Sequence, residues 1–229
     1  MREILTAFIA ALCLIGILSV STALGGPIVS VDPPDLNGLK GETLTVNITI
    51  DPQGEEIYGA QYDLYFDPAV LQVVSQTGGD FLSQDGANTI EVANTFNNTA
   101  GKLEYGETRI GTSSGVSGAG VLARITFNLT NCGSSDLALS NVILANTSAQ
   151  PIPGLRLNNS SVHGLIRGDL APYPDGNCVV DMGDVIRLLN HVHDRERYPV
   201  NEGVADLNLD GKIDMDDVML LVSYVGEEE

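Results

Sequence analysis

Aspartates recur at fixed spacing in the segment DLNLDGKIDMDD, which runs from Asp206 to Asp217. With Asp206 as position 1, oxygen-bearing groups fall at positions 3, 5, 7, 9 and 12, and Gly211 at position 6 permits a sharp turn. A hard cation needs about six to eight oxygen ligands, which a tightly wound loop can supply. The spacing predicts a calcium site of the EF-hand type with the ligands Asp206, Asn208, Asp210, the carbonyl of Lys212, Asp214 and Asp217.

The same loop occurs a second time upstream. The segment DGNCVVDMGDVIRLLNHV (175–192) aligns without a gap with NLDGKIDMDDVMLLVSYV (208–225). The first copy contains a four-residue insert, APYP, between positions 1 and 3, and Cys178 replaces the turn glycine. We expect a second calcium site there, with the ligands Asp169, Asp175, Asn177, the carbonyl of Val179, Asp181 and Asp184.

A helical pattern follows each loop. The apolar residues at helical offsets are Val185, Leu188, Leu189 and Val192, and then Val218, Leu221, Val222 and Val225. We expect both stripes to pack into one small core. A region of about sixty residues with two short helices buries little apolar surface, so calcium binding would supply much of its folding free energy.

The chain before the first loop has the period of strands. TLTVNITI (43–50) and RITFNLT (124–130) alternate apolar and polar residues, and segments such as DPQGEE and SSGVSGAG supply the turns. Many short strands without helical periodicity predict an antiparallel β-sandwich. The expected fold is therefore mainly β with a small α domain, divided into a sandwich over residues 27–166 and a calcium module over residues 168–226.

The N-terminal segment resembles a secretory signal peptide. A charged start at Arg2 precedes an apolar run from Ile4 to Val20, and small residues then predict cleavage near Ala23. An uncleaved membrane anchor is the alternative, because the run is close to the length that spans a bilayer. Residues 1–23 therefore predict a secreted or cell-surface protein. Cys132 and Cys178 can form one bridge in an oxidising compartment, but we expect two separate, small buried residues.

Charge and composition disfavour several classes of function. Segment 24–167 has 14 acidic and 6 basic residues, net −8, and segment 168–229 has 15 and 4, net −11. Nucleic acids and anionic membranes require basic patches, so neither is an expected partner. The mature chain shows no nucleophile motif and no phosphate-binding loop, and His191 and His193 do not share a helix face. We therefore expect no enzymatic activity.

Six acceptor triplets for N-glycosylation lie in the strand region. They begin at Asn47, Asn97, Asn128, Asn146, Asn158 and Asn159. Asn47 and Asn128 fall on the polar side of their strands, where a glycan would face solvent. Chance occurrence in a chain rich in Asn and Thr explains the triplets equally well.

The duplicated calcium loop, each copy followed by one helix, resembles a dockerin of the type I kind, as found in archaeal surface proteins. The resemblance covers residues 168–226. In that family, partner contacts centre on loop positions 10 and 11 and on the following helix, which implies the contact residues Met182, Gly183, Asn190, Met215, Asp216 and Ser223. Leu189 and Val222 also fall at such positions, but they belong to the apolar stripes, so we expect them to pack in the core.

The strand region resembles a cohesin, the partner module of a dockerin. The segments that carry this resemblance are YGAQYDLYFDPAVLQVV (58–74), GAGVLARITFNL (118–129) and SDLALSNVILAN (135–146). Cohesins are nine-stranded jelly-roll sandwiches, so the resemblance implies that topology.

Together the two resemblances imply a scaffold or adaptor that binds cohesin- and dockerin-bearing proteins through calcium-dependent contacts, and that reaches polysaccharide only through its partners. The alternative is a carbohydrate-binding or surface-layer sandwich with a structural calcium module, because sandwiches host many functions. Head-to-tail association of two copies is also open. The short joint at residues 166–169 disfavours docking within one chain.

Overall fold

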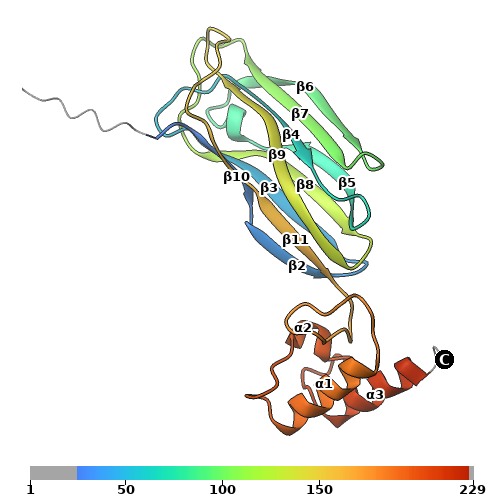
Figure 1. Ribbon diagram of the computed structural model, residues 1–229. Helices are drawn as coiled ribbons and strands as arrows, with labels where there is room; N and C mark the ends of the chain where they lie inside the picture. The colour runs from blue at the N-terminus through green and yellow to red at the C-terminus, as the bar shows by residue number, and fades with distance from the viewer. Residues whose placement is uncertain (1–24, 227–229) are drawn as a thin grey trace, which may run out of the picture.

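The computed structural model describes residues 25–226, which form a β-sandwich and a small helical module at one end of it (Figure 1). The helical module contains α1 (Met182–His193), α2 (Glu202–Ala205) and α3 (Met215–Gly226). The expected signal peptide, residues 1–23, lies outside the described residues. Within residues 25–226, none of the helices combines the length and the apolar character that crossing a membrane requires.

Eleven strands and one helical turn build the sandwich. They are β1 (Ile28–Asp32), β2 (Asp35–Leu39), β3 (Thr43–Asp51), β4 (Gly59–Tyr65), β5 (Leu71–Gly78), η1 (Phe81–Ser83), β6 (Asn88–Asn97), β7 (Lys102–Ile110), β8 (Gly120–Leu129), β9 (Gly133–Ala145), β10 (Arg156–Asn158) and β11 (Ser160–Leu165). One sheet has the order β10-β1-β3-β8-β5 and the other β2-β11-β9-β4-β7-β6. The two sheets confirm the expected fold class.

The alternation seen in the sequence determines which side chains fill the sandwich. Val46 and Ile48 of β3 lie opposite Ile125 and Ala123 of β8, and all four side chains are buried. Successive strand residues point to opposite faces, so the intervening polar residues face solvent. Sequence periodicity therefore accounts for the core that joins the two sheets.

The first and last strands of the sandwich each cross from one sheet to the other. β1 pairs with β3 in the five-stranded sheet, whereas β2, which follows Pro33 and Pro34, pairs with β11 in the six-stranded sheet. β10 and β11 divide in the same way around Asn159. If β1 and β2 are counted as one interrupted strand, and β10 and β11 as another, the eleven strands become the nine that the resemblance implied. Proline lacks the amide that a continuous ladder needs, which accounts for the first interruption.

The helical module shares its core with the end of the sandwich. Leu165 of β11 is buried in the same apolar cluster as residues of α1, α2 and α3, and Leu39 of β2 packs against that cluster. The side chain of Arg167 donates a hydrogen bond to the carbonyl of Asp206 at 2.6 Å, and the amide of Gly168 donates to the carbonyl of Val204 at 2.9 Å. The joint is therefore packed between the modules rather than extended.

The expectation that Cys132 and Cys178 are separate buried residues was wrong. They form a disulfide with a Cα–Cα distance of 5.6 Å, and Cys178 is exposed. The bond joins the turn between β8 and β9 to the first calcium loop, across 46 positions of sequence. Counting two cysteines cannot reveal this contact, because it arises only when the helical module packs on the sandwich.

Replacing Leu165 with alanine should destabilise the helical module by about 2–4 kcal/mol, because it leaves a cavity in the shared cluster. The matched control is Leu157→Ala in β10, where the same change at an exposed side chain should cost less than about 1 kcal/mol. Chemical unfolding followed by the circular dichroism of the helices measures both values. Equal effects of the two substitutions would contradict a shared core.

Candidate calcium loops and docking surface

The second loop turns its side-chain oxygens toward its own backbone. Asp206 accepts hydrogen bonds from the amides of Asp210 at 3.2 Å and Gly211 at 2.9 Å. Asn208 accepts from Asp210 at 2.9 Å, and Asp210 accepts from Lys212 at 2.8 Å. These contacts wind the segment into a closed turn, with Gly211 in the left-handed region at φ +82°.

Asp217 ties the end of this loop to its beginning. The residue lies in the first turn of α3, and its side chain is 0% exposed. Its carboxylate accepts hydrogen bonds from the amides of Leu207 at 2.8 Å, Asn208 at 3.3 Å and Asp214 at 3.0 Å. The last predicted ligand is therefore held in a fixed orientation inside the loop.

The first loop repeats this arrangement around Asp184. Its carboxylate is 1% exposed and accepts from the amides of Leu170, Ala171 and Asp181, each at 2.7 Å. The Asp181 side chain in turn accepts from the amide of Gly183, and Asp181 and Asp184 together form a capping box at the start of α1. The capping residues of the helix are thus also predicted calcium ligands.

Asp169 occupies the first position of the first loop. It is 2% exposed and accepts hydrogen bonds from the amides of Asn177 at 3.0 Å and Cys178 at 2.6 Å. Burial raises the pKa of the Asp169 carboxyl, and the charges of Asp184 and Asp181 raise it further, against the lowering effect of the two backbone hydrogen bonds. Negative charge is therefore crowded at this point of the loop.

The donor set fits calcium. Asp169, Asp184 and Asp217 are buried, and none of them forms an ion pair with a basic side chain of the described residues. A buried charge is normally paired or bound to a metal, and all the predicted ligand atoms here are oxygens, which calcium prefers. Dockerin-like loops would hold the ion through these carboxylates, and the ion would neutralise their mutual repulsion.

The other predicted ligands differ in how well they are placed. Asn177 accepts from the amide of Val179 at 2.9 Å, and Asp214 accepts from the amide of Asp216 at 2.9 Å, as expected in a wound loop. Asp175 is exposed, and its side chain makes no hydrogen bond within residues 25–226. The two calcium assignments therefore stay predictions, and the second loop is the more regular of the two.

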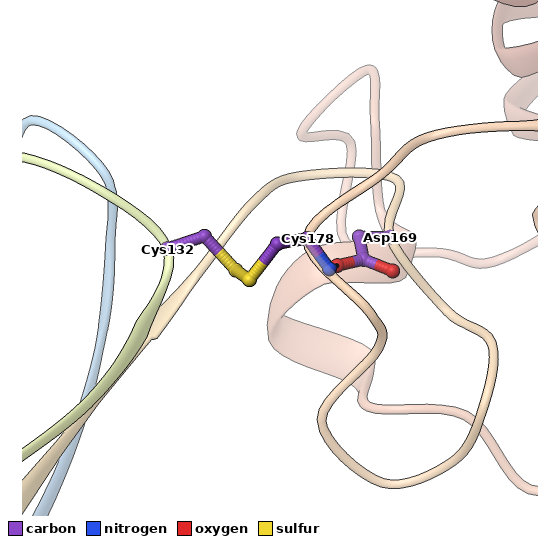
Figure 2. Close-up of side chains that lie close together, drawn as sticks. All are labelled: Cys132, Asp169 and Cys178. Atoms are coloured by element: carbon purple, nitrogen blue, oxygen red, sulfur yellow. Dashed lines mark hydrogen bonds between the residues drawn. A yellow bond between two sulfur atoms is a disulfide. The ribbon is translucent and has the colours of Figure 1, made fainter.

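Cys132, Asp169 and Cys178 lie together at the first loop, with their ligand atoms within 4.8 Å of one another (Figure 2). Figure 2 shows the two sulfur atoms bonded to each other and the Cys178 backbone nitrogen directed at the Asp169 carboxylate. Sulfurs in a disulfide are not thiolates and do not bind metal as thiolates do. This group is therefore a crosslink beside a carboxylate rather than a cysteine metal site.

The predicted partner-contact residues lie mostly on the surface. Met182 and Met215 stand at the starts of α1 and α3 and are exposed. Exposed backbone or side chains also occur at Gly183, Asp216 and Ser223, whereas Asn190 is partly buried. These placements leave the residues open to a partner, and their contact role stays a prediction.

The expectation that Leu189 and Val222 pack in the core was wrong. Leu189 is 46% exposed and Val222 is 41% exposed, although Leu188 and Leu221 beside them are buried. Two crossed helices of three turns cover only one side of each other, so the far edge of each apolar stripe remains in solvent.

Two surface residues were not found by the sequence analysis. Ile186 is 55% exposed and Met219 is 63% exposed, and each lies one turn after an exposed methionine of its helix. The repeat could have identified these residues, because Ile186 and Met219 occupy equivalent positions in the two copies. The resulting surfaces are a first stripe of Met182, Ile186 and Leu189, and a second stripe of Met215, Met219 and Val222.

The predicted glycosylation residues lie on strands and turns of the sandwich. Asn97, Asn158 and Asn159 are exposed, and Asn47, Asn128 and Asn146 are partly buried. Several of their amides already bond to protein: for example, Asn159 accepts from the amide of Leu139 at 3.0 Å. Use of the triplets stays a prediction.

Comparison with known proteins identifies both modules. The family model for the cohesin domain matches residues 29–151, and the model for the type I dockerin domain matches residues 174–226. No curated protein matches the chain.

Solved cohesin structures share the fold of the sandwich. A non-cellulosomal cohesin from the hyperthermophilic archaeon Archaeoglobus fulgidus has a TM-score of 0.50 and 16% identity, over 61% of this chain and 91% of that one. A type I cohesin–dockerin complex from Clostridium thermocellum has a TM-score of 0.50 and 13% identity, over 61% of this chain and 95% of that one. CaCohA2 from Clostridium acetobutylicum has a TM-score of 0.50 and 20% identity, over 61% of this chain and 90% of that one. At these identities the likeness shows the fold alone.

The cohesin model covers more than half of the 229 residues, and the two sheets agree with it. Cohesins and dockerins are non-catalytic interaction modules, and type I dockerins generally bind calcium. The chain therefore belongs to the cohesin domain family and carries a type I dockerin domain after its cohesin domain.

Proposed function

We propose that this protein is a non-catalytic adaptor that joins two partners through calcium-dependent contacts, one at its dockerin and one at its cohesin. The observation that carries the proposal is the set of three buried carboxylates, Asp169, Asp184 and Asp217, beside two exposed apolar stripes. Without an ion the carboxylates repel one another, and with two ions bound they hold α1 and α3 in place. Calcium would thus control the surface that a partner recognises.

The first and second stripes are suited to protein contact. Each consists of apolar side chains at the same three positions of its helix, and both stripes are open to solvent. Soluble proteins seldom expose contiguous apolar surface without a use for it, and methionine adapts its shape to different partners. Gly183 and Asp216 lie beside the stripes on the exposed side of each helix. A cohesin-bearing protein is the partner that this module would take.

A flat apolar area on the outer face of β9, β4, β7 and β6 is the corresponding surface of the cohesin. Ile90 and Val92 of β6 and Ile143 of β9 are exposed there. Gly59 and Gly106 lie on the same face and carry no side chain, whereas Gln61 lies between Ile143 and Gly106 in the register. A Cβ atom on Gly106 would lie 3.0 Å from Cγ2 of Val92, so Val92 folds across this glycine. A dockerin helix could lie on such a surface.

The two docking surfaces lie too far apart for one chain to bind itself. β9 begins at Gly133, next to the crosslinked Cys132, and Ile143 lies ten residues further along the strand. At about 3.3 Å per residue, this strand carries the apolar area roughly 33 Å away from the helical module. The disulfide and the shared core hold the module at its end of the sandwich. This arrangement supports an adaptor between two different molecules.

The proposal includes an extracellular location. The apolar N-terminal segment and the acceptor triplets for glycosylation point to secretion or to the cell surface. A disulfide persists mainly outside the reducing cytosol, which supports the same location. Any contact with polysaccharide would pass through the partners.

Removing calcium with a chelator should unfold the helices while the strands persist, because the buried carboxylates then lose the counter-charge that the ion supplies. Asp217→Ala should weaken binding at one site at least about tenfold, since the residue is a predicted ligand and also closes its loop. Asp216→Ala, an exposed neighbour, is the control and should keep nearly the wild-type affinity. Calorimetric calcium titration and far-UV circular dichroism test these expectations. Unchanged helicity after chelation would contradict them.

Charge placed on both stripes should abolish capture of a cohesin-bearing protein. The variant Ile186→Asp/Met219→Asp changes one central residue of each stripe, whereas Val74→Asp changes an apolar residue of β5 that is 55% exposed and lies outside both stripes and both calcium loops. In a pull-down with the full chain, we expect wild type and the control to retain cohesin-bearing proteins with calcium and to release them with chelator. Capture that is indifferent to calcium or to the stripe variant would refute the proposed mode of binding.

An adaptor between different partners should be monomeric alone. Light scattering of the full chain with calcium at micromolar concentration should give the mass of one chain. A mass that increases with concentration would show head-to-tail association and would favour polymerisation over adaptor function.

A further inference from the structure

In addition to the shared apolar core, each calcium loop has its own link to the sandwich side of the molecule. In the second loop, the attachment is the hydrogen bond from Arg167 to the carbonyl of Asp206, the first ligand residue. In the first loop, it is the covalent bond from Cys178 to Cys132. The two copies of the repeat therefore differ in how firmly they are fixed, and the first copy has the stronger attachment.

The crosslinked position is the one that orients the first ligand. Position 6 of the second loop is Gly211 at φ +82°, and its amide donates to Asp206. Position 6 of the first loop is Cys178 at φ +68°, and its amide donates to Asp169. Both amides donate to the carboxylate with their residue in the left-handed conformation, which glycine adopts readily and cysteine does not. The crosslink thus lies at the residue that needs help to keep this conformation.

Leu209 provides a comparison within the second loop. It also adopts a left-handed conformation, at φ +61°, without a crosslink. Its amide, however, donates to neither Asp206 nor Asp217, whereas the amides of the next two residues donate to Asp206. A side chain in the left-handed region is therefore tolerated where the amide does not orient a ligand.

The first loop also has more chain to order. The insert at residues 171–174 lengthens the path from position 1, Asp169, to position 3, Asp175. In the second loop a single residue separates position 1, Asp206, from position 3, Asn208. A longer loop loses more conformational entropy when it closes, and a covalent link reduces that loss. The insert and the disulfide occur in the same copy of the repeat, which is the pattern expected if one compensates for the other.

The other end of the crosslink adjoins a paired strand of the sandwich. Cys132 precedes Gly133, which is paired with Gly164 of β11 in the six-stranded sheet. The amide of Cys132 donates a hydrogen bond to Oδ1 of Asn131 at 3.1 Å. Cys178 is therefore bonded to a turn residue that directly precedes a paired strand of the sandwich. Figure 2 shows this link running from the β8–β9 turn to the loop beside Asp169.

We propose that the Cys132–Cys178 disulfide orders the first loop before calcium arrives, with Cys132 and Cys178 acting as positioning residues for that site. The cohesin thereby contributes to a calcium site that lies in the dockerin. The part of this inference that concerns calcium affinity rests on the proposed function, whereas the ordering of the loop does not.

The test compares the full-length wild type with Cys132→Ser, which removes the crosslink and leaves every residue of the loop unchanged. In calcium-free buffer, hydrogen exchange at the amides of Asn177 and Cys178 should become at least about tenfold faster. The equivalent amides of the second loop, Asp210 and Gly211, are the internal control and should keep their rates. In a calcium titration, one of two binding events should weaken about tenfold and the other should not change.

A second variant separates the bond from the residue. Cys132→Ser/Cys178→Gly removes the crosslink and supplies the glycine that the second loop has, so its loop amides should exchange more slowly than in Cys132→Ser but still clearly faster than in the wild type. If the glycine restores wild-type protection, or if exchange is unchanged without the crosslink, the proposal is overturned. Equally faster exchange in both loops would also overturn it. If the wild type binds no calcium, the proposed function fails, and the exchange rates still decide whether the crosslink orders the loop.

Discussion

Repulsion between buried carboxylates is the constraint on which the helical module depends. Asp169, Asp184 and Asp217 are withdrawn from water, and within the described residues they have backbone amides but no basic side chains around them. Amides orient a carboxylate without cancelling its charge. In the proposed calcium-bound form, a cation would balance those carboxylates and so hold the loops from which α1 and α3 begin.

Sequence alone could predict what is local. The 33-residue repeat and the alternation in β3 and β8 are properties of short segments, and each predicted elements that the structure contains. The ligand spacing is equally local, and the two calcium sites that it predicts stay a prediction. Contacts between distant segments could not be predicted in this way. The pairing of Cys132 with Cys178 depends on how the helical module packs against the β8–β9 turn, and no periodicity reports that packing.

The error over Leu189 and Val222 has a related cause. Helical periodicity identifies an apolar stripe, but the width that becomes buried depends on how much neighbouring structure covers it. In a large domain, further elements would cover both edges. Here α1 and α3 cover only the side they share, so Leu188 and Leu221 are buried and the next residue of each helix is not. An apolar residue at the edge of a stripe is therefore ambiguous until the size of the core is known.

The packed joint determines how two partners would be arranged. Leu39 and Leu165 place the sandwich end within the core of the helical module, and Arg167 and the disulfide add two further attachments. A flexible linker would let bound partners sample many relative positions. A joint of this kind instead holds the two docking surfaces at one separation and one relative angle.

The outer strands that switch between the sheets also affect how the protein would resist tension. β2, near the start of the sandwich, lies parallel to β11, which leads directly into the helical module. Tension applied between the start of the sandwich and the helical module would pull these two strands in opposite directions along their length. The hydrogen bonds from Asp35–Ser161 to Leu39–Leu165 would then resist sliding together instead of opening one after another.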